Sequence, residues 1–183
     1  NPTIYEYDTL SSEEKWDENF DVILANPPFM SPKGGIRPHK RFSIQANRAE
    51  VLFVDYIIEH LKPNGRAGIV VPEGVLHNNT AAFKKVRKEL IERQLLYAVV
   101  ELHHGVFKPY ASVKTHILFI DSKLAKQKNE ILFVRVKNDG LSITGARKII
   151  NENDIPKALE LIKLFKENKS IITTENNIDY NLV

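Results

Sequence analysis

The sequence predicts an α/β fold built on a doubly wound, mostly parallel sheet. Three runs of apolar, largely β-branched residues have the character of strands buried on both faces, at residues 20–25, 67–72 and 95–100. Between them, residues 48–61 and 80–90 carry apolar side chains at helical spacing. Such alternation is typical of parallel sheets, because each helix returns the chain to the start of the next strand.

The composition fits one domain and excludes several classes of protein. The chain has 183 residues and a hydrophobic content of 43%, enough for a sizeable core. It contains no cysteine, so a disulfide framework is excluded. The chain has no run of about 20 apolar residues, so we expect no membrane span. Its first residues do not form a signal peptide, so we expect a cytoplasmic protein. A net charge of +3 suits an anionic partner.

The first predicted strand ends in a rigid corner. Residues 20–25 run directly into Asn26-Pro27-Pro28-Phe29. The two prolines remove two backbone donors and fix two φ angles, so the strand cannot continue. In open α/β sheets, ligands bind at the carboxyl ends of the strands. The corner is therefore a candidate site, and an ordinary strand-ending turn is the alternative interpretation.

This corner resembles motif IV of amino-methyltransferases, the Asp/Asn/Ser-Pro-Pro-aromatic signature of enzymes that methylate the exocyclic nitrogen of adenine in DNA. The resemblance implies catalytic roles for Asn26, Pro27, Pro28 and Phe29. The Asn26 side-chain oxygen and the Pro27 carbonyl would accept the two N–H groups of the amine. Its lone pair would then face the methyl group of S-adenosylmethionine. Phe29 would stack on an adenine flipped out of the duplex.

A second pattern lies before the strand expected near residues 115–121. The run Gly105-Val106-Phe107-Lys108-Pro109-Tyr110-Ala111 resembles the motif VIII region in methylation subunits of type I restriction–modification systems. The resemblance makes Phe107 a second residue that stacks on the flipped base, and a core Phe that closes a hairpin is the alternative. The link from residues 95–100 is too short for a crossover helix, so we expect the strand near 115–121 to be antiparallel.

The cofactor side of the site is only partly represented. Asp8 follows a strand-like run at residues 4–7, and the resemblance implies that it contacts the adenine ring of S-adenosylmethionine. An Asp that starts a turn is the alternative. The family's glycine-rich cofactor turn, motif I, has no match in the chain. We therefore expect a partial Rossmann-like methyltransferase sheet that lacks the main cofactor-binding motif and is inactive alone.

We divide the chain at residue 150. Residues 1–150 would form the C-terminal part of the methyltransferase catalytic domain, and residues 151–183 a helical extension with a polar tail. The helix is expected at 155–165, with Ile155, Leu159, Ile162 and Phe165 facing inward. The closing residues resemble the type I family just past its methyltransferase domain, which suggests that the chain is a cut piece.

A basic loop follows the corner, and its cations are candidate contacts to DNA phosphates. These are Lys33, Arg37, Lys40 and Arg41. A solvated charged loop is the alternative. We expect no metal site, because the chain has no cysteine and no His-Glu-x-x-His pattern, and adjacent His103 and His104 would face opposite sides of a strand.

Taken together, these features predict an S-adenosylmethionine-dependent DNA adenine-N6 methyltransferase, the modification subunit of a type I system. Its partners would be DNA and the specificity and restriction subunits. An amino-methyltransferase that acts on guanine in RNA or glutamine in protein, and a non-catalytic DNA-binding module, are the alternatives. Because the family's neighbours of the strand at 22–25 are missing, we expect either the run at 4–7 or a second copy to pair with its free edge.

Overall fold

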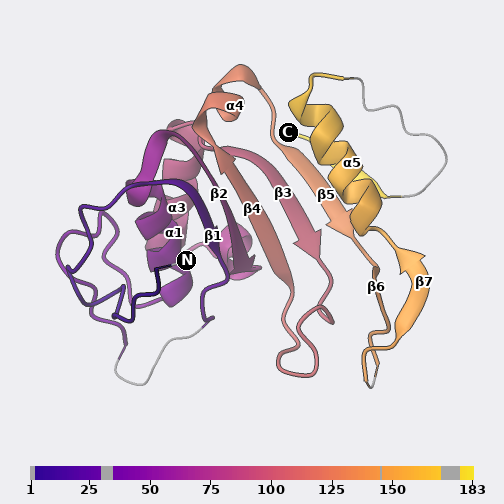
Figure 1. The fold of residues 1–183 in the computed structure, drawn as a ribbon, viewed down its shortest axis with the longest axis horizontal. Coiled ribbons are helices and arrows are strands. Elements are labelled where there is room, and N and C mark those ends of the chain that lie inside the picture. The colour runs from indigo at the N-terminus through magenta and orange to yellow at the C-terminus, as the bar shows by residue number, and fades with distance from the viewer. Residues whose placement is uncertain (1–2, 30–34, 145, 170–177) are drawn as a thin grey trace.

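The computed structural model describes residues 3–29, 35–144, 146–169 and 178–183. Its elements alternate between strands and helices over most of the chain (Figure 1). In chain order they are β1 (Phe20–Ala25), α1 (Ala49–His60), β2 (Leu61–Pro72), α2 (Gly74–His77), α3 (Ala81–Glu92), β3 (Leu96–Leu102), β4 (Thr115–Asp121), α4 (Ser122–Gln127), β5 (Leu132–Val136), β6 (Asp139–Leu141), β7 (Ile149–Asn153), α5 (Ile155–Lys166) and β8 (Asp179–Leu182).

Six of these strands form one sheet, in the order β1-β2-β4-β3-β5-β8. The strands β1, β2, β3 and β5 run in the same direction, whereas β4 and β8 run in the opposite direction. The predicted α/β class, with a mostly parallel sheet and an antiparallel strand near 115–121, is confirmed. As expected from the short link, β3 and β4 pair antiparallel.

Helices cover both faces of the sheet. The helices α1 and α3 lie on one face and enclose a core that includes Val54, Ile69 and Leu118. The helices α4 and α5 lie on the other face, over a second core that includes Leu132 and Leu161 (Figure 1). Burying a large aliphatic side chain fully stabilises a fold by about 1.5–3 kcal/mol, so these two cores hold the layers together.

The chain passes directly from α1 into β2. The pairing of β1 with β2 jumps from Phe20–Leu61 to Val22–Arg66, so that residues 62–65 bulge out of the ladder. A Cβ atom on Gly65 would lie 2.9 Å from Cγ of Leu61, which leaves room only for glycine in this tight bend.

The expected burial of β1 on both faces is wrong. The strand lies at the edge of the sheet, and its residues Val22 and Leu24 are 50% and 82% exposed. The run at 4–7 forms no strand and does not cover this edge, contrary to one of the two expected outcomes. Instead, the Tyr7 hydroxyl lies 3.1 Å from the Tyr56 hydroxyl on α1. Among the described residues, only β2 pairs with β1.

The last part of the chain joins the same sheet. The strand β8, which lies in the predicted polar tail, pairs with β5. The helix α5 buries Ala158, Leu161, Ile162 and Phe165, whereas Leu159 is 60% exposed. The inward position expected for Leu159 is therefore wrong, because the buried positions are spaced by three and four residues from Ala158. The division of the chain at residue 150 stays a prediction.

Candidate functional site

The Asn-Pro-Pro-Phe corner directly follows β1 at the carboxyl edge of the sheet. Pro27 is buried, Phe29 is half-buried, and Asn26 is exposed at the surface. The ends of β2, β3 and β5 reach the same edge, since these strands run parallel to β1 (Figure 1). The corner therefore holds an accessible amide and an aromatic ring where ligands bind in open α/β sheets.

The rings of Phe29 and Phe107 lie next to each other. Their centroids are 6.3 Å apart and their planes are at 88°, an edge-to-face arrangement. The two residues belong to the two motifs that carry the methyltransferase resemblance, and the fold brings them together from separate connections. Edge-to-face pairs of this kind also stabilise a fold, by about 0.5–1.5 kcal/mol.

Lys114 fastens the end of the 103–114 loop to the sheet. Its Nζ lies 3.1 Å from Oε1 of Glu101 and 3.4 Å from Oε1 of Glu73. The backbone N–H of Glu73 donates to the Lys114 carbonyl at 3.0 Å. Burial would raise the pKa of Glu101, but hydrogen bonds from Lys114 and Arg135 outweigh it and hold this pKa below its usual value. The carboxylate is therefore charged and anchors the loop.

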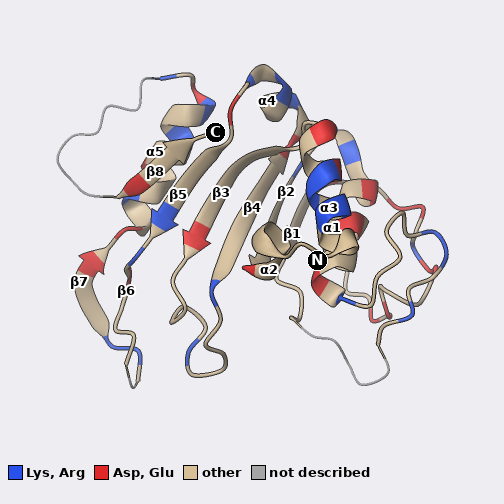
Figure 2. Ribbon diagram, turned by 180° about the vertical axis from the view of Figure 1, so that it is seen from behind, with Lys and Arg blue, Asp and Glu red and all other residues tan. Residues whose placement is uncertain are grey.

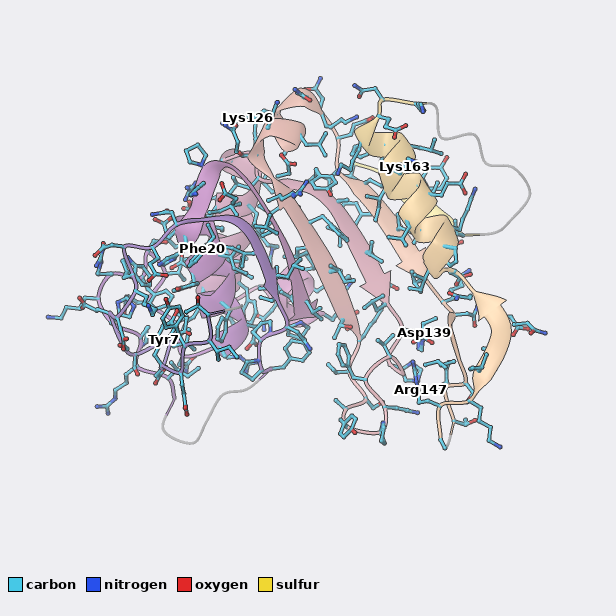
Figure 3. The ribbon with its side chains drawn as sticks, in the orientation of Figure 1. Tyr7, Phe20, Lys126, Asp139, Arg147 and Lys163 are labelled. Carbon is cyan, nitrogen blue, oxygen red and sulfur yellow. The ribbon has the colours of Figure 1, made fainter. Side chains whose placement is uncertain are left out.

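The start of the same loop contacts the hairpin of β6 and β7. Asp139 on β6 forms an ion pair with Arg147, and its Oδ1 lies 3.3 Å from Nε2 of His103. The Arg147 guanidinium also donates to the Gly105 carbonyl. Figure 3 shows Asp139 and Arg147 where the loop meets the hairpin. Sequence reasoning missed these residues, because each looks like an ordinary charge in a turn.

Asp8 caps a turn at the surface. Its carboxylate accepts hydrogen bonds from the backbone N–H groups of Leu10 and Ser11, at 3.0 and 3.3 Å, and from the Ser11 hydroxyl. These bonds, with that of the Ser11 hydroxyl first, lower the pKa of Asp8 despite some burial. The geometry matches the turn alternative, and a contact between Asp8 and a cofactor stays a prediction.

The candidate phosphate contacts differ in their surroundings. Arg37 and Lys40 are exposed. Arg41 forms an ion pair with Asp17 and lies 5.6 Å from the centroid of the Trp16 ring. Lys33 lies outside the described residues. Of the four cations, Arg41 is therefore already engaged within the chain.

A comparison with protein families decides the assignment. The family model described as N-6 DNA Methylase matches residues 1–181, nearly the whole chain. The chain belongs to the N-6 DNA methylase family. The resemblance to methylation subunits of type I systems, drawn from the two motifs, is confirmed by the relatives of this chain.

Two curated relatives and one solved structure illustrate the likeness. The chain is 41% identical to the type I restriction enzyme EcoEI methylase subunit of Escherichia coli over 105 residues, which cover 57% of this chain and 21% of that protein. It is 27% identical over 172 residues to the MjaIX methylase subunit of Methanocaldococcus jannaschii, covering 87% of this chain and 30% of that protein. A chain from a study of the assembly and conformational transition of a type I system superposes with a TM-score of 0.74 at 28% identity, covering 99% of this chain and 38% of that chain.

The chain thus corresponds to less than two fifths of the length of these three relatives. Within the described ranges, its His, Asp and Glu side chains form no group of three that could hold a metal ion. None of the helices in the same ranges is long and apolar enough to cross a membrane.

A separate groove of about 540 Å³ lies between α3 and β8. Its floor is apolar and includes Leu96 and Phe133, with charged side chains such as Arg87 and Asp179 also lining it. Neither the corner residues nor any part of the 103–114 loop line this groove. The candidate site of this chain is therefore the open edge at Asn26, Phe29 and Phe107.

Proposed function

We propose that the protein containing this chain is an S-adenosylmethionine-dependent DNA adenine-N6 methyltransferase and serves as the methylation subunit of a type I restriction–modification system. The observation that carries the proposal is the pairing of Phe29 with Phe107 directly beyond the exposed Asn26. An amide acceptor beside two aromatic rings suits a planar base with an exocyclic amine. The family and its type I relatives support the same assignment.

The proposed mechanism concerns the base. The N6 lone pair of adenine is delocalised into the ring, so the amine is a poor nucleophile. Acceptors on both N–H groups, the Asn26 side-chain oxygen and the Pro27 carbonyl, would draw the nitrogen toward a tetrahedral geometry and stabilise the positive charge that develops on it. Phe29 and Phe107 would hold the flipped base in this orientation, and correct orientation can remove about 7–11 kcal/mol of a barrier.

The residues of this chain fit the base better than the cofactor. The Asp8 carboxylate is already used by the N–H groups of its own turn, and the sequence contains no Gly-x-Gly turn after a strand. We therefore assign this chain to the base side of the site. S-adenosylmethionine is the methyl donor that the proposed reaction requires.

Exposed cations at the same edge suit the DNA backbone. Arg37 and Lys40 keep their proposed role as phosphate contacts, as does Lys33, whereas Arg41 is engaged by Asp17. Figure 2 shows further Lys and Arg in the β3–β4 loop and in the β6–β7 hairpin, but Lys108, Lys114 and Arg147 there are engaged within the chain, as Arg41 is. We propose that Lys33, Arg37 and Lys40 contact the phosphates of DNA, and that specificity and restriction subunits complete the complex.

The central test is the substitution Asn26→Ala in the full-length protein with its co-purifying subunits. We expect the rate of methyl transfer to fall by about 10²–10³-fold, roughly 2.7–4 kcal/mol, the effect of deleting one preorganised polar group at an active site. Cofactor affinity should change little. Asn64→Ala is the matched control, because Asn64 is exposed in the bend at the opposite end of β2. Near-normal turnover by Asn26→Ala would disprove the role of Asn26.

Methyl-labelled cofactor distinguishes the alternatives. With DNA, RNA and protein offered together as acceptors, the proposal expects label in DNA at the N6 position of adenine. Label in guanine of RNA or in glutamine of protein would show that the protein is an amino-methyltransferase of another class, and the proposal would be wrong. DNA binding that weakens steeply with salt but transfers no label would instead indicate a non-catalytic module.

We further propose that the free edge of β1 pairs with a second copy when this chain is isolated. An exposed strand edge is a template for another strand, and Leu24 is 82% exposed on it. Leu24→Lys should reduce the mass measured by light scattering to that of a monomer without changing stability by more than about 0.5 kcal/mol. A monomeric unsubstituted chain at high concentration would disprove the proposal.

A further inference from the structure

The loop that carries Phe107 has little packing of its own. Within residues 103–114, Val106 and Phe107 are only half-buried, and Tyr110 at the tip is 96% exposed. A loop with so few buried apolar contacts is expected to open locally at low free energy. Something other than a hydrophobic core must therefore fix the position of Phe107 next to Phe29.

The described residues of the β6–β7 hairpin make polar contacts with this loop. Arg147 donates to the Gly105 carbonyl, and Asp139, which is paired with Arg147, lies against His103. A third contact comes from Lys108 in the loop, whose Nζ donates to the Ile143 carbonyl at 3.2 Å. The contacted loop residues lie on both sides of Phe107 in the sequence, because His103 and Gly105 precede it and Lys108 follows it.

The loop and the hairpin also meet at van der Waals distance. A Cβ atom on Gly105 would lie 3.0 Å from Nδ1 of His103 and 3.2 Å from Cγ2 of Ile143. The backbone N–H of Gly105 donates to Nδ1 of His103 at 3.1 Å. The two segments therefore approach so closely that a shift of the hairpin would move the loop.

The ion pair at the centre of these contacts is largely removed from solvent. The side chains of Asp139 and Arg147 are only 11% and 13% exposed. Burial would raise the pKa of Asp139, but the hydrogen bond from Arg147 and the neighbouring His103 outweigh it and lower this pKa. The guanidinium uses two different N–H groups, one for the carboxylate and one for the carbonyl, which a single ammonium group cannot reproduce with the same geometry.

We propose that Asp139 and Arg147 are positioning residues, which hold the 103–114 loop so that Phe107 meets Phe29 and the target base. The inference rests on the role proposed above for Phe107, since these two residues do not touch the base themselves. They act through the Gly105 carbonyl and His103. A purely structural pair would stabilise the hairpin without affecting the geometry at Phe107.

We call the contacts of Asp139 and Arg147 with the 103–114 loop the tether. Hydrogen–deuterium exchange of the full-length protein tests this tether without relying on activity. In Arg147→Met, the amides of Lys108 and Ala111, which donate within the loop at 3.1 and 3.0 Å, should exchange at least tenfold faster. Amides of β3 and β4 should be unchanged. Arg93→Met is the matched control, because it removes an Arg–Glu pair with Glu59 away from the loop. Unchanged exchange in the loop would overturn the proposal, and Asp139→Asn provides a second variant if Arg147→Met does not fold.

A double-mutant cycle then tests whether the tether acts through Phe107. Arg147→Met should lower kcat for methyl transfer by up to about 10²-fold, as expected for a misplaced group, with cofactor KM unchanged. In a Phe107→Ala background the same substitution should have no further effect. Additive losses would overturn the positioning role. Full activity of Phe107→Ala would instead overturn the proposed role of Phe107. A wild-type protein that methylates no DNA would disprove the proposed function. In either case the exchange experiment still tests whether the tether holds the loop.

Discussion

The two connections that follow β1 and β3 reach the same edge of the sheet but are held there by different forces. The connection after β1 includes the 35–48 segment, which buries Phe42 and Ile44 almost completely. In the connection after β3, the 103–114 loop buries only Gly105, and Tyr110 is 96% exposed. The 35–48 segment is therefore held mainly by buried apolar side chains, with hydrogen bonds from Ser43 and Ile44 to Asp55, whereas the 103–114 loop is held mainly by hydrogen bonds and ion pairs.

The packed segment gathers around one tryptophan. The centroid of the Trp16 ring lies 4.3 Å from that of the His39 ring and 4.8 Å from that of the Phe42 ring, in edge-to-face contacts. The contact of Asp139 with Arg147, by contrast, depends on the charge of one carboxylate. We therefore expect the position of Phe107 to be more sensitive than the packed segment to the loss of a single charge.

The largest effect is expected from Phe42→Ala in the packed segment. Phe42 is 3% exposed, so its removal leaves a cavity and should lower the free energy of unfolding by about 3–5 kcal/mol. Tyr110→Ala is the matched aromatic control in the other connection and should change stability by less than about 0.5 kcal/mol. Denaturant unfolding measures both, and equal losses would contradict the difference between the connections.

Asp139→Asn should have an intermediate effect that depends on pH. At neutral pH, the change leaves Arg147 without its carboxylate and should cost about 1–3 kcal/mol. The pKa of Asp139 in the folded chain lies below its ordinary value of 3.8. The ion pair therefore contributes fully above pH 3.8, and its contribution is lost as the pH falls through the lower, folded value.

Unfolding measured from neutral pH down to the acid limb tests this difference. The stability of the wild-type chain and that of Asp139→Asn should converge as the pH falls below about 4, the ordinary range of an Asp carboxyl. Tyr110→Ala serves as the control, since Tyr110 is 96% exposed and its small effect on stability should stay constant over the same range. A gap between wild type and Asp139→Asn that does not change with pH would show that the Asp139 charge contributes nothing.

The sequence predicted the layers of the fold because their pattern is local. Val86 and Leu90 are spaced for one face of α3, and both are buried as expected. The exposure of β1 could not be read in the same way, since its apolar residues fit a central strand and only the sheet order makes it an edge. The strand β8 was missed for a similar reason: four residues of mixed polarity become a strand only because β5 lies beside them.

The same limit applies to the site. Asn26, Phe29 and Phe107 stand in motifs whose residue types already suggest chemistry, so they could be singled out before the fold was known. Asp139 and Arg147 could not, since their partners His103 and Gly105 lie far away in sequence. A weak signal was available for Asp139 alone: the next residue is Gly140, whose φ of +82° suits glycine and coincides with the irregular register of β6.

The smallest effect is expected from Arg41→Met, and it sharpens the comparison because Arg41 and Arg147 each pair with one aspartate. The side chains of Arg41 and Asp17 are 39% and 86% exposed, so water and salt screen their attraction. We expect no change in the unfolding midpoint beyond the scatter of repeated measurements. Raising the salt from about 0.1 M to about 1 M shortens the Debye length from ~10 Å to ~3 Å and should remove any residual difference from wild type. The loss in Arg147→Met should persist at both salt concentrations, because its ion pair is shielded from solvent. If Arg41→Met proved as destabilising as Arg147→Met, or if salt abolished the loss in Arg147→Met, burial would not be what distinguishes the two connections.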